Sequence, residues 1–201
     1  ISAGGNIMNR QGSSSLVGSG SDRRNGLVIP GLYNVSNIPL NNIRVNSNQY
    51  EKAIYSLYGL ASIGFKGMLY LDVTGRNDWS STLPESNRSY FYPSASLSWL
   101  ANYTFALPDN ISLLKARAGW AQVGNDTDPY RLEQTLGIGT WNTLTTQSVP
   151  STLLNPDLKP ELATSIEFGI DFNMFNDRLR FSGTYYTMDN ENQIFSVPLP
   201  R

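Results

Sequence analysis

The feature that most constrains the fold is a strict two-residue alternation from Thr164 to Asn190. Apolar or small side chains alternate with polar ones in two runs, and Phe175-Asn176-Asp177-Arg178 separates the runs. The apolar or small positions are Ile166, Phe168, Ile170, Phe172 and Met174 in the first run and Leu179, Phe181, Gly183 and Tyr185 in the second. A period of two is typical of a β-strand with one apolar and one wet face. The stretch therefore predicts two antiparallel strands, each long enough, at about ten residues, to cross a bilayer at a tilt.

The turn between these strands fixes a register that can be tested. If Asn176-Asp177 is a two-residue turn, Phe172 pairs with Phe181, Phe168 with Tyr185 and Asn173 with Arg180. In this register apolar residues of one strand face apolar residues of the other, and polar residues face polar ones, so the register and the face assignment agree.

Composition excludes several classes of chemistry. The chain has no cysteine and no histidine, which rules out disulfides, Cys/His metal sites, cysteine nucleophiles and Ser-His-Asp triads within it. Lys+Arg 15 nearly balance Asp+Glu 16, so no charge excess points to nucleic acid. No apolar run approaches the roughly eighteen residues of a membrane helix. We expect a non-enzymatic β protein, and the abrupt start and end lead us to expect a segment of a longer one.

Alternation elsewhere predicts an all-β fold of about six to seven antiparallel strands. The expected strands are 1–8, 54–64, 68–77, 91–100, 111–123, 164–174 and 179–189, and the expected long loops are 9–53, 78–90 and 124–163. Phe65-Lys66-Gly67 fits a three-residue turn with glycine in the left-handed conformation, which would pair Ile63 with Leu69.

Charge placement points to a membrane wall. Seven charges in the expected strands have the parity of the polar face: Asp72, Arg76, Lys115, Arg117, Glu167, Asp171 and Arg180. Short and long connections alternate, as in outer-membrane barrels with short periplasmic turns and long external loops. Phe65, Trp99 and Phe175 would then lie near the periplasmic interface of the membrane and Trp120 near its external interface. A soluble β-sandwich that binds carbohydrate is the alternative, although its strands are usually shorter.

Several segments, in order along residues 54 to 190, carry a family resemblance: Tyr58-Gly59, Gly75-Arg76-Asn77-Asp78-Trp79-Ser80-Ser81, Tyr92-Pro93-Ser94, Leu113 to Asn125, Asn155-Pro156-Asp157-Leu158-Lys159-Pro160-Glu161, Phe168-Gly169-Ile170-Asp171 and Leu179 to Tyr186. Together they resemble the SusC/RagA family of TonB-dependent transporters of the Bacteroidetes outer membrane. Many relatives have Arg-Asp-Gly-Ser where this chain has Asn77-Asp78-Trp79-Ser80.

The resemblance implies a segment of a large transmembrane barrel of about 22 strands. It implies a plug domain, absent from this chain, through which TonB energises import, and a SusD-like surface lipoprotein that closes the external mouth. Membrane lipid and the remaining strands of the barrel are the other expected partners, since open sheet edges cannot stay unpaired in hydrocarbon. The cargo, glycan or peptide, is left open.

Candidate functional residues fall in two groups. The seven charges would line the bore, either as a hydrated, mutually paired wall or in contact with cargo; Asp171 lies diagonally from Arg180, which suggests one such pair. Four aromatic residues in the expected loops would stack on a sugar ring, pack within the loops or contact the lipoprotein: Trp79, Tyr90, Tyr130 and Trp141.

A metal site is not expected. Asp126-Thr127-Asp128 suggests calcium, but the glycine and the terminal glutamate of an EF-hand loop are absent, which favours a surface turn. We expect no cofactor, and leave calcium on external loops or on the lipoprotein as an open alternative.

Overall fold

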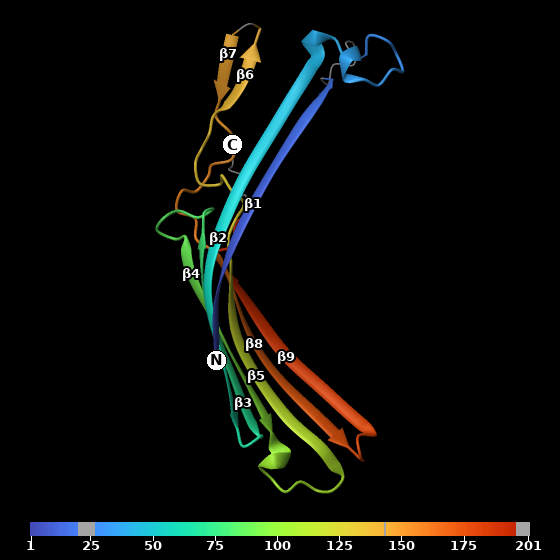
Figure 1. Cartoon of the computed structure of the whole chain (residues 1–201), viewed down its shortest axis with the longest axis vertical. Coiled ribbons are helices and arrows are strands. Elements are labelled where there is room, and N and C mark those ends of the chain that lie inside the picture. The colour runs from blue at the N-terminus through green and yellow to red at the C-terminus, as the bar shows by residue number, and fades with distance from the viewer. Residues whose placement is uncertain (20–26, 143, 196–201) are drawn as a thin grey trace. The chain divides into compact units, whose positions relative to one another are not determined.

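The computed structural model describes residues 1–19, 27–142 and 144–195, and in these ranges the chain is all-β (Figure 1). Its strands are β1 (Ser2–Ser19), β2 (Ile43–Phe65), β3 (Leu69–Ser80), β4 (Ser89–Leu100), β5 (Ile111–Asn125), β6 (Gly137–Trp141), β7 (Leu144–Ser148), β8 (Glu161–Met174) and β9 (Leu179–Glu191). The same described ranges contain the 3-10 helices η2 (Val35–Asn37), η3 (Leu40–Asn42) and η4 (Ala101–Tyr103). None of the helices in these ranges is long and apolar enough to span a membrane.

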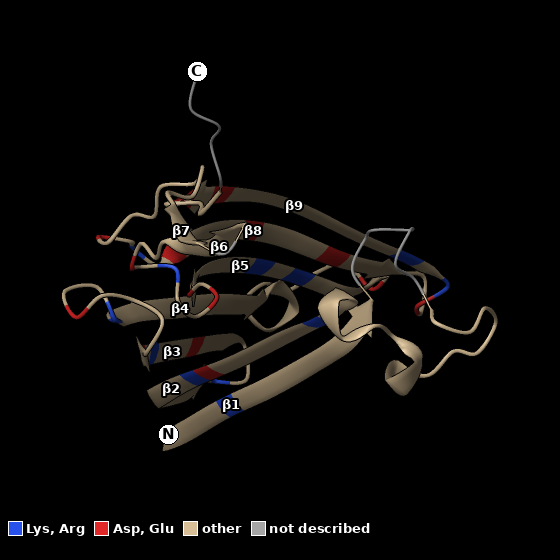
Figure 2. Ribbon diagram, turned by 90° about the horizontal axis from the view of Figure 1, so that it is seen from above, with Lys and Arg blue, Asp and Glu red and all other residues tan. Residues whose placement is uncertain are grey.

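Seven strands form one antiparallel sheet, which confirms the predicted fold class. The sheet order is β1-β2-β3-β4-β5-β8-β9, and β6 and β7 pair separately in the long connection between β5 and β8. Figure 2 shows the seven strands side by side. Neighbours in the sheet are neighbours in sequence except across that connection, as in an up-and-down barrel.

The chain divides into two compact units, and β1 and β2 have part of their length in each. One unit comprises Ile1–Met8 and Ala53–Arg201, and the other comprises Asn9–Lys52. Residues 9–19 and 43–53 are strands, where the sequence predicted a loop. These residues are mostly polar and lack apolar alternation, so the pattern that marks a half-buried strand is missing although backbone pairing continues.

Within the Asn9–Lys52 unit, one buried asparagine organises the segment between the strands. The side chain of Asn37 accepts a hydrogen bond from the amide of Ile29 at 2.9 Å and donates to the carbonyls of Ile29 and Leu32 at 2.8 and 2.7 Å. The ring of Tyr50 covers Gly12, where a Cβ atom would lie 2.3 Å from it.

The predicted register of the last hairpin is confirmed. Phe172 pairs with Phe181, Phe168 with Tyr185 and Asn173 with Arg180.

The β2–β3 hairpin differs from its prediction by two residues. Phe65 pairs with Leu69 and Ile63 with Leu71, so the turn is Lys66-Gly67-Met68. Lys66 and Gly67 both have positive φ, 49° and 67°. The predicted register was wrong, but a shift of two residues keeps every side chain on its predicted face.

The register separates the sheet into two chemically different faces. One row of paired residues crosses six strands through Ile63, Leu71, Leu97, Ala118, Phe168 and Tyr185, and we call its side the apolar face. The adjacent row crosses through Ser62, Asp72, Ser96, Gly119, Glu167 and Tyr186, and we call its side the charged face. By strand parity, all seven charges singled out in the sequence belong to the charged face.

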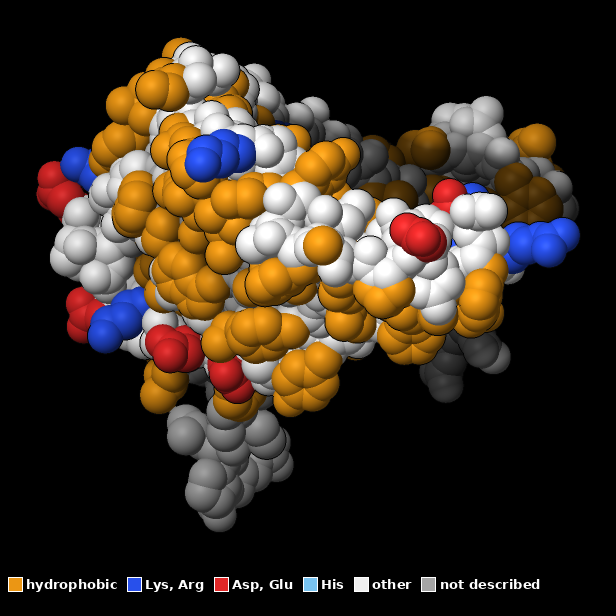
Figure 3. All heavy atoms as spheres, turned by 90° about the horizontal axis from the view of Figure 1, so that it is seen from below, with side chains coloured by type: hydrophobic (Ala, Val, Ile, Leu, Met, Phe, Trp, Pro, Cys, Tyr) orange, Lys and Arg blue, Asp and Glu red, His pale blue; other side chains and the backbone are white. Residues whose placement is uncertain are grey.

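No second layer of protein covers the apolar face within the described residues. Ile63, Phe168 and Ile170 are 60%, 55% and 44% exposed. Figure 3 shows a broad area of hydrophobic side chains with few charged ones among them. A sandwich would bury these side chains against a second sheet, so the alternative of a soluble β-sandwich is wrong.

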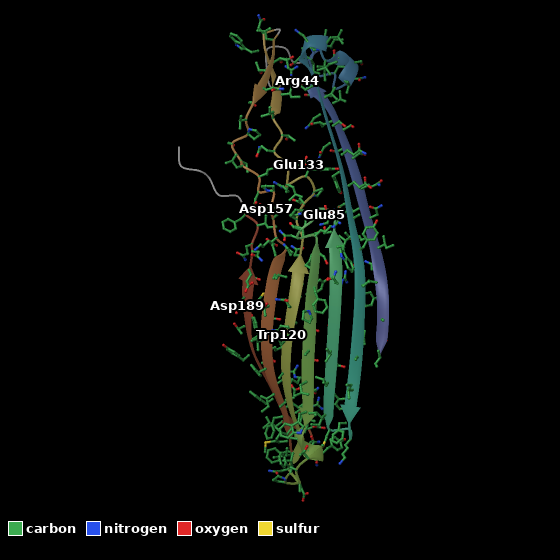
Figure 4. The ribbon with its side chains drawn as sticks, turned by 90° about the vertical axis from the view of Figure 1, so that its left-hand side faces the viewer. Arg44, Glu85, Trp120, Glu133, Asp157 and Asp189 are labelled. Carbon is green, nitrogen blue, oxygen red and sulfur yellow. The ribbon has the colours of Figure 1, made fainter. Side chains whose placement is uncertain are left out.

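The apolar face ends at a definable level. The last of its rows before the long connections contains Trp120, Ile166 and Thr187. The next row on this face, closer to the long connections, is polar and contains Gln122, Thr164 and Asp189. Figure 4 places Asp189 beyond Trp120 on the way to Glu85 and Asp157 in the loops. Asp189 and Glu191 thus have the parity of the apolar face, but they lie beyond its apolar rows. A charge costs little there, because the penalty for a charge on a lipid face falls toward the interface.

Candidate functional site at the loop end of the sheet

A polar cluster forms where β3 and β4 approach the loop that joins them, residues 81–88. Successive even-numbered residues at the end of β3 share the charged face, and the register pairs Arg76 with Tyr92 and Asp78 with Tyr90. We call Arg76, Asp78, Tyr90 and Tyr92 the tyrosine cluster. Strand parity puts these four side chains on one face, and the β3–β4 register brings them together.

Asp78 is the centre of the tyrosine cluster and is only 5% exposed. Its Oδ1 accepts a hydrogen bond from Arg76 Nε at 2.8 Å, and its Oδ2 accepts one from the Tyr92 hydroxyl at 2.6 Å. Arg76 Nη2 donates to Ser56 Oγ at 3.0 Å, which ties β2 into the cluster. The buried charge is therefore paired and hydrogen-bonded, the condition under which a charge is tolerated away from water.

The two tyrosine rings stiffen this arrangement. Their centroids are 5.9 Å apart and their planes differ by 22°, and the guanidinium carbon of Arg76 lies 5.9 Å from the Tyr92 centroid. Tyr90 is 7% exposed. Stacked rings and a cation over an aromatic face add to the packing.

A second polar group joins the 81–88 loop to the start of the β5–β8 connection. Asp126 Oδ2 accepts hydrogen bonds from Ser80 Oγ at 2.5 Å and from Thr82 Oγ1 at 3.3 Å. The two hydroxyl oxygens are 2.9 Å apart, and the amide of Thr82 donates to Ser80 Oγ. We call Ser80, Thr82 and Asp126 the clamp; all three residues are buried.

Further hydrogen bonds hold the far end of the β5–β8 connection, next to β8. Asn87 Nδ2 donates to the carbonyls of Leu158 at 3.0 Å and Asp157 at 3.4 Å. Glu161 accepts from Asn125 Nδ2 at 3.1 Å and from the amide of Ile194 at 2.7 Å. The loop 81–88 and the two ends of the β5–β8 connection therefore form one hydrogen-bonded platform.

The β6–β7 hairpin extends from this platform, and the residues of both its strands are solvent-exposed. Trp141 pairs with Leu144, and these residues are 74% and 63% exposed; Ile138 is 79% exposed. The segment 134–156 contains no charged residue. An isolated two-stranded hairpin is marginally stable in water, and a surface that is poor in charge and carries a tryptophan resembles the core of a protein interface.

Nearer the turn end, the charged face is a hydrogen-bonded wall. Arg117 Nε lies 3.3 Å from Asp171 Oδ2, and Ser182 donates to Asp171 Oδ1 at 2.7 Å. Arg180, which the sequence placed near Asp171, instead donates to the carbonyl of Asp177. No group of three or more Asp, Glu, His or Cys residues suited to a metal occurs in the part of the chain that the structure describes.

The four aromatic candidates from the sequence fall into two pairs. Tyr130 and Trp141 are exposed in the β5–β8 connection, at 69% and 74%. Trp79 and Tyr90 are not in a loop, because β3 continues to Ser80 and β4 begins at Ser89. Tyr90 is buried in the tyrosine cluster, so a role as an accessible stacking platform is wrong for it; Trp79 has the parity of the apolar face.

Sequence reasoning missed the clamp. Its members come from three positions without a shared local pattern, and only the fold brings Asp126 to Ser80. The sequence favoured a surface turn at Asp126-Thr127-Asp128, which is wrong for Asp126, because its side chain is buried and accepts hydrogen bonds from Ser80 and Thr82.

Comparisons with known proteins agree with this fold. Residues 4–201 match the family model of "TonB dependent receptor-like, beta-barrel". TonB-dependent receptor P3 of Formosa agariphila is 29% identical over 75% of this chain and 16% of its own length, and TonB-dependent receptor P26 of the same organism is 29% identical over 85% and 18%. The chain thus spans less than a fifth of these relatives.

Solved structures give the same result for the fold. The structure of the RagAB peptide transporter matches 98% of this chain and 22% of its own chain, with a TM-score of 0.81 and 22% identity. The RagAB peptide importer in its "open-open" state matches the same shares with a TM-score of 0.76 and 23% identity.

Proposed function

Because the chain belongs to the family of TonB dependent receptor-like β-barrels, we propose that the complete protein imports oligomeric nutrients, either glycan or peptide. The chain itself is a segment of an outer-membrane barrel, in a family of transport proteins rather than enzymes. In this proposal a plug outside this chain receives energy from TonB, and a SusD-like lipoprotein closes the external mouth.

The observation that carries the proposal is the separation of the two faces across six strands. Exposed apolar rows that end at the polar Gln122–Thr164–Asp189 row suit contact with lipid, whereas the hydrogen-bonded row around Arg117 and Asp171 suits a hydrated bore. The charged face, with its seven charges, would then face the lumen. Both edge strands, β1 and β9, would pair with other strands of the same barrel, because free backbone groups in hydrocarbon each cost several kcal/mol.

The platform and the β6–β7 hairpin would contact the lipoprotein. The hairpin has uncharged, exposed side chains and needs a partner surface to become stable, and Asn87 and the clamp fix its base. Tyr130 and Trp141 remain candidates for contact with the lipoprotein or the cargo.

Replacing Gly137–Ser148 by a short Gly-Ser link in the full-length protein tests this role. Gly137 pairs with Ser148, so a short link closes the gap without moving the rest of the connection. We expect an assembled barrel, weaker co-purification of the lipoprotein and slower uptake. A hairpin variant with Thr140→Ser and Thr145→Ser is the matched control. Unchanged co-purification and uptake would count against the hairpin as the contact.

A further inference from the structure

A hollow lies on the charged face next to the tyrosine cluster. Its volume is about 380 Å³, within the range of small-molecule pockets. Its lining includes Tyr58, Leu60, Arg76, Tyr92, Ala121 and Val123. These residues share the parity of the charged face on β2, β3, β4 and β5.

The hollow exists because β4 and β5 part at this level. Their pairing ends at Ser94 and Ala121, although β4 continues to Ser89 and β5 to Asn125. The next residue of β4 is Pro93, which has no N–H to donate to a neighbouring strand. The small side chains of Ser94 and Ala121 leave the space between the separating strands unfilled.

The polar groups around the hollow are largely committed to each other. Thr74 Oγ1 and Ser94 Oγ are 2.6 Å apart, and the Tyr92 hydroxyl donates to Asp78. Arg76 uses Nε for Asp78 and Nη2 for Ser56, and its Nη1 donates to no protein group in the described ranges. The hollow therefore offers hydrocarbon from Leu60, Ala121 and Val123, two aromatic rings and one guanidinium nitrogen with donors to spare.

We propose that this hollow binds an apolar side chain of an oligopeptide, with the neighbouring main-chain carbonyl accepting a hydrogen bond from Arg76 Nη1. This inference rests on the proposed import function and assigns the cargo to the peptide class. A sugar ring carries hydroxyls around its edge, and burying them against Leu60, Ala121 and Val123 would leave them unpaired. A leucine-sized side chain gains from the same surface.

Filling the hollow is the direct test. Ala121→Leu adds bulk without removing a hydrogen-bonding group, and Ala118→Leu makes the same change on the apolar face of the same strand as a control. The probes are an oligopeptide with a central leucine and its serine counterpart, measured by binding to the full-length protein with its lipoprotein and by uptake into cells. Val123→Phe fills the hollow from an exposed position and serves as the second variant where Ala121→Leu lowers the yield of folded barrel.

The wild type and the control should bind the leucine peptide about tenfold more tightly than the serine peptide. The filling variants should abolish that preference and leave the serine peptide within about twofold. Equal affinity for both peptides in the wild type, or equal losses for both in Ala121→Leu, overturns the proposal. Uptake of a neutral oligosaccharide but of neither peptide overturns it and leaves the import function standing. Uptake of none of the three contradicts the import function as well.

Discussion

Asp126 Oδ2 lies 2.5 Å from the hydroxyl oxygen of Ser80, a residue 46 positions earlier in the chain. Through this contact and the bond from Thr82, the start of the long β5–β8 connection is fixed to the end of β3. The geometry of the platform therefore depends in part on a buried carboxylate.

Asp126→Ala should loosen the platform without preventing barrel assembly. It leaves the buried hydroxyls of Ser80 and Thr82 without their acceptor, a loss of about 1–3 kcal/mol. We expect local opening to be favoured, and protease cleavage within 127–136 of the full-length protein to accelerate about tenfold, since each 1.4 kcal/mol is a factor of ten.

Asp157→Ala is the matched control for the clamp, because its side chain is exposed in the same connection and its backbone carbonyl, not its carboxylate, accepts from Asn87. Equal cleavage rates in Asp126→Ala and Asp157→Ala would show that the clamp does not restrain the connection.

Gly124→Ala should impair barrel assembly through a steric conflict with Tyr90. A Cβ atom at Gly124 would lie 2.5 Å from Tyr90 Cδ2, and that ring is buried and stacked on Tyr92. We expect a destabilisation of about 1–3 kcal/mol, typical of overpacking. The fraction of folded barrel that survives stepwise heating in detergent measures it.

Gly119→Ala on the same strand is the control for that variant. Its nearest neighbour would be Glu167 Cβ at 3.9 Å, an ordinary contact. If the two alanine variants melted at the same temperature, the close approach at Tyr90 would have no energetic consequence.

The Arg117–Asp171 ion pair should contribute little to stability. The two side chains are 36% and 24% exposed, and Arg117 Nε makes no hydrogen bond of good geometry although it lies 3.3 Å from Asp171 Oδ2. A double-mutant cycle with Arg117→Gln and Asp171→Asn should give a coupling energy below about 1 kcal/mol that shrinks with added salt. A coupling of several kcal/mol, insensitive to salt, would contradict this account of a hydrated wall.

The sequence predicted the parts of the fold that depend on local alternation. The pairing of Phe168 with Tyr185 follows from counting outward from one short turn, and faces stayed correct even where the β2–β3 register was wrong by two residues. Residues 9–19 and 43–53 were missed as strands because polar residues carry no alternation.

The candidate site was less predictable than the fold. Tyr90 was placed in a loop because β4 starts two residues earlier than the apolar pattern does, and that error turned a buried ring into an apparent stacking platform. The clamp depends on contacts between residues far apart in sequence, such as Ser80 and Asp126, and no local pattern encodes them.

Spin labels at two adjacent residues of β8 test the central claim, that the apolar face contacts lipid and the charged face lines the bore. Phe168 and Glu167 lie on opposite faces of the strand, so labels at these positions sample different environments. Their depths along the strand differ by only one residue. In the full-length protein in liposomes, the label at Phe168 should collide mainly with lipid-soluble oxygen, and the label at Glu167 mainly with a water-soluble nickel chelate. The reverse pattern, or oxygen-dominated relaxation at both positions, would contradict the account.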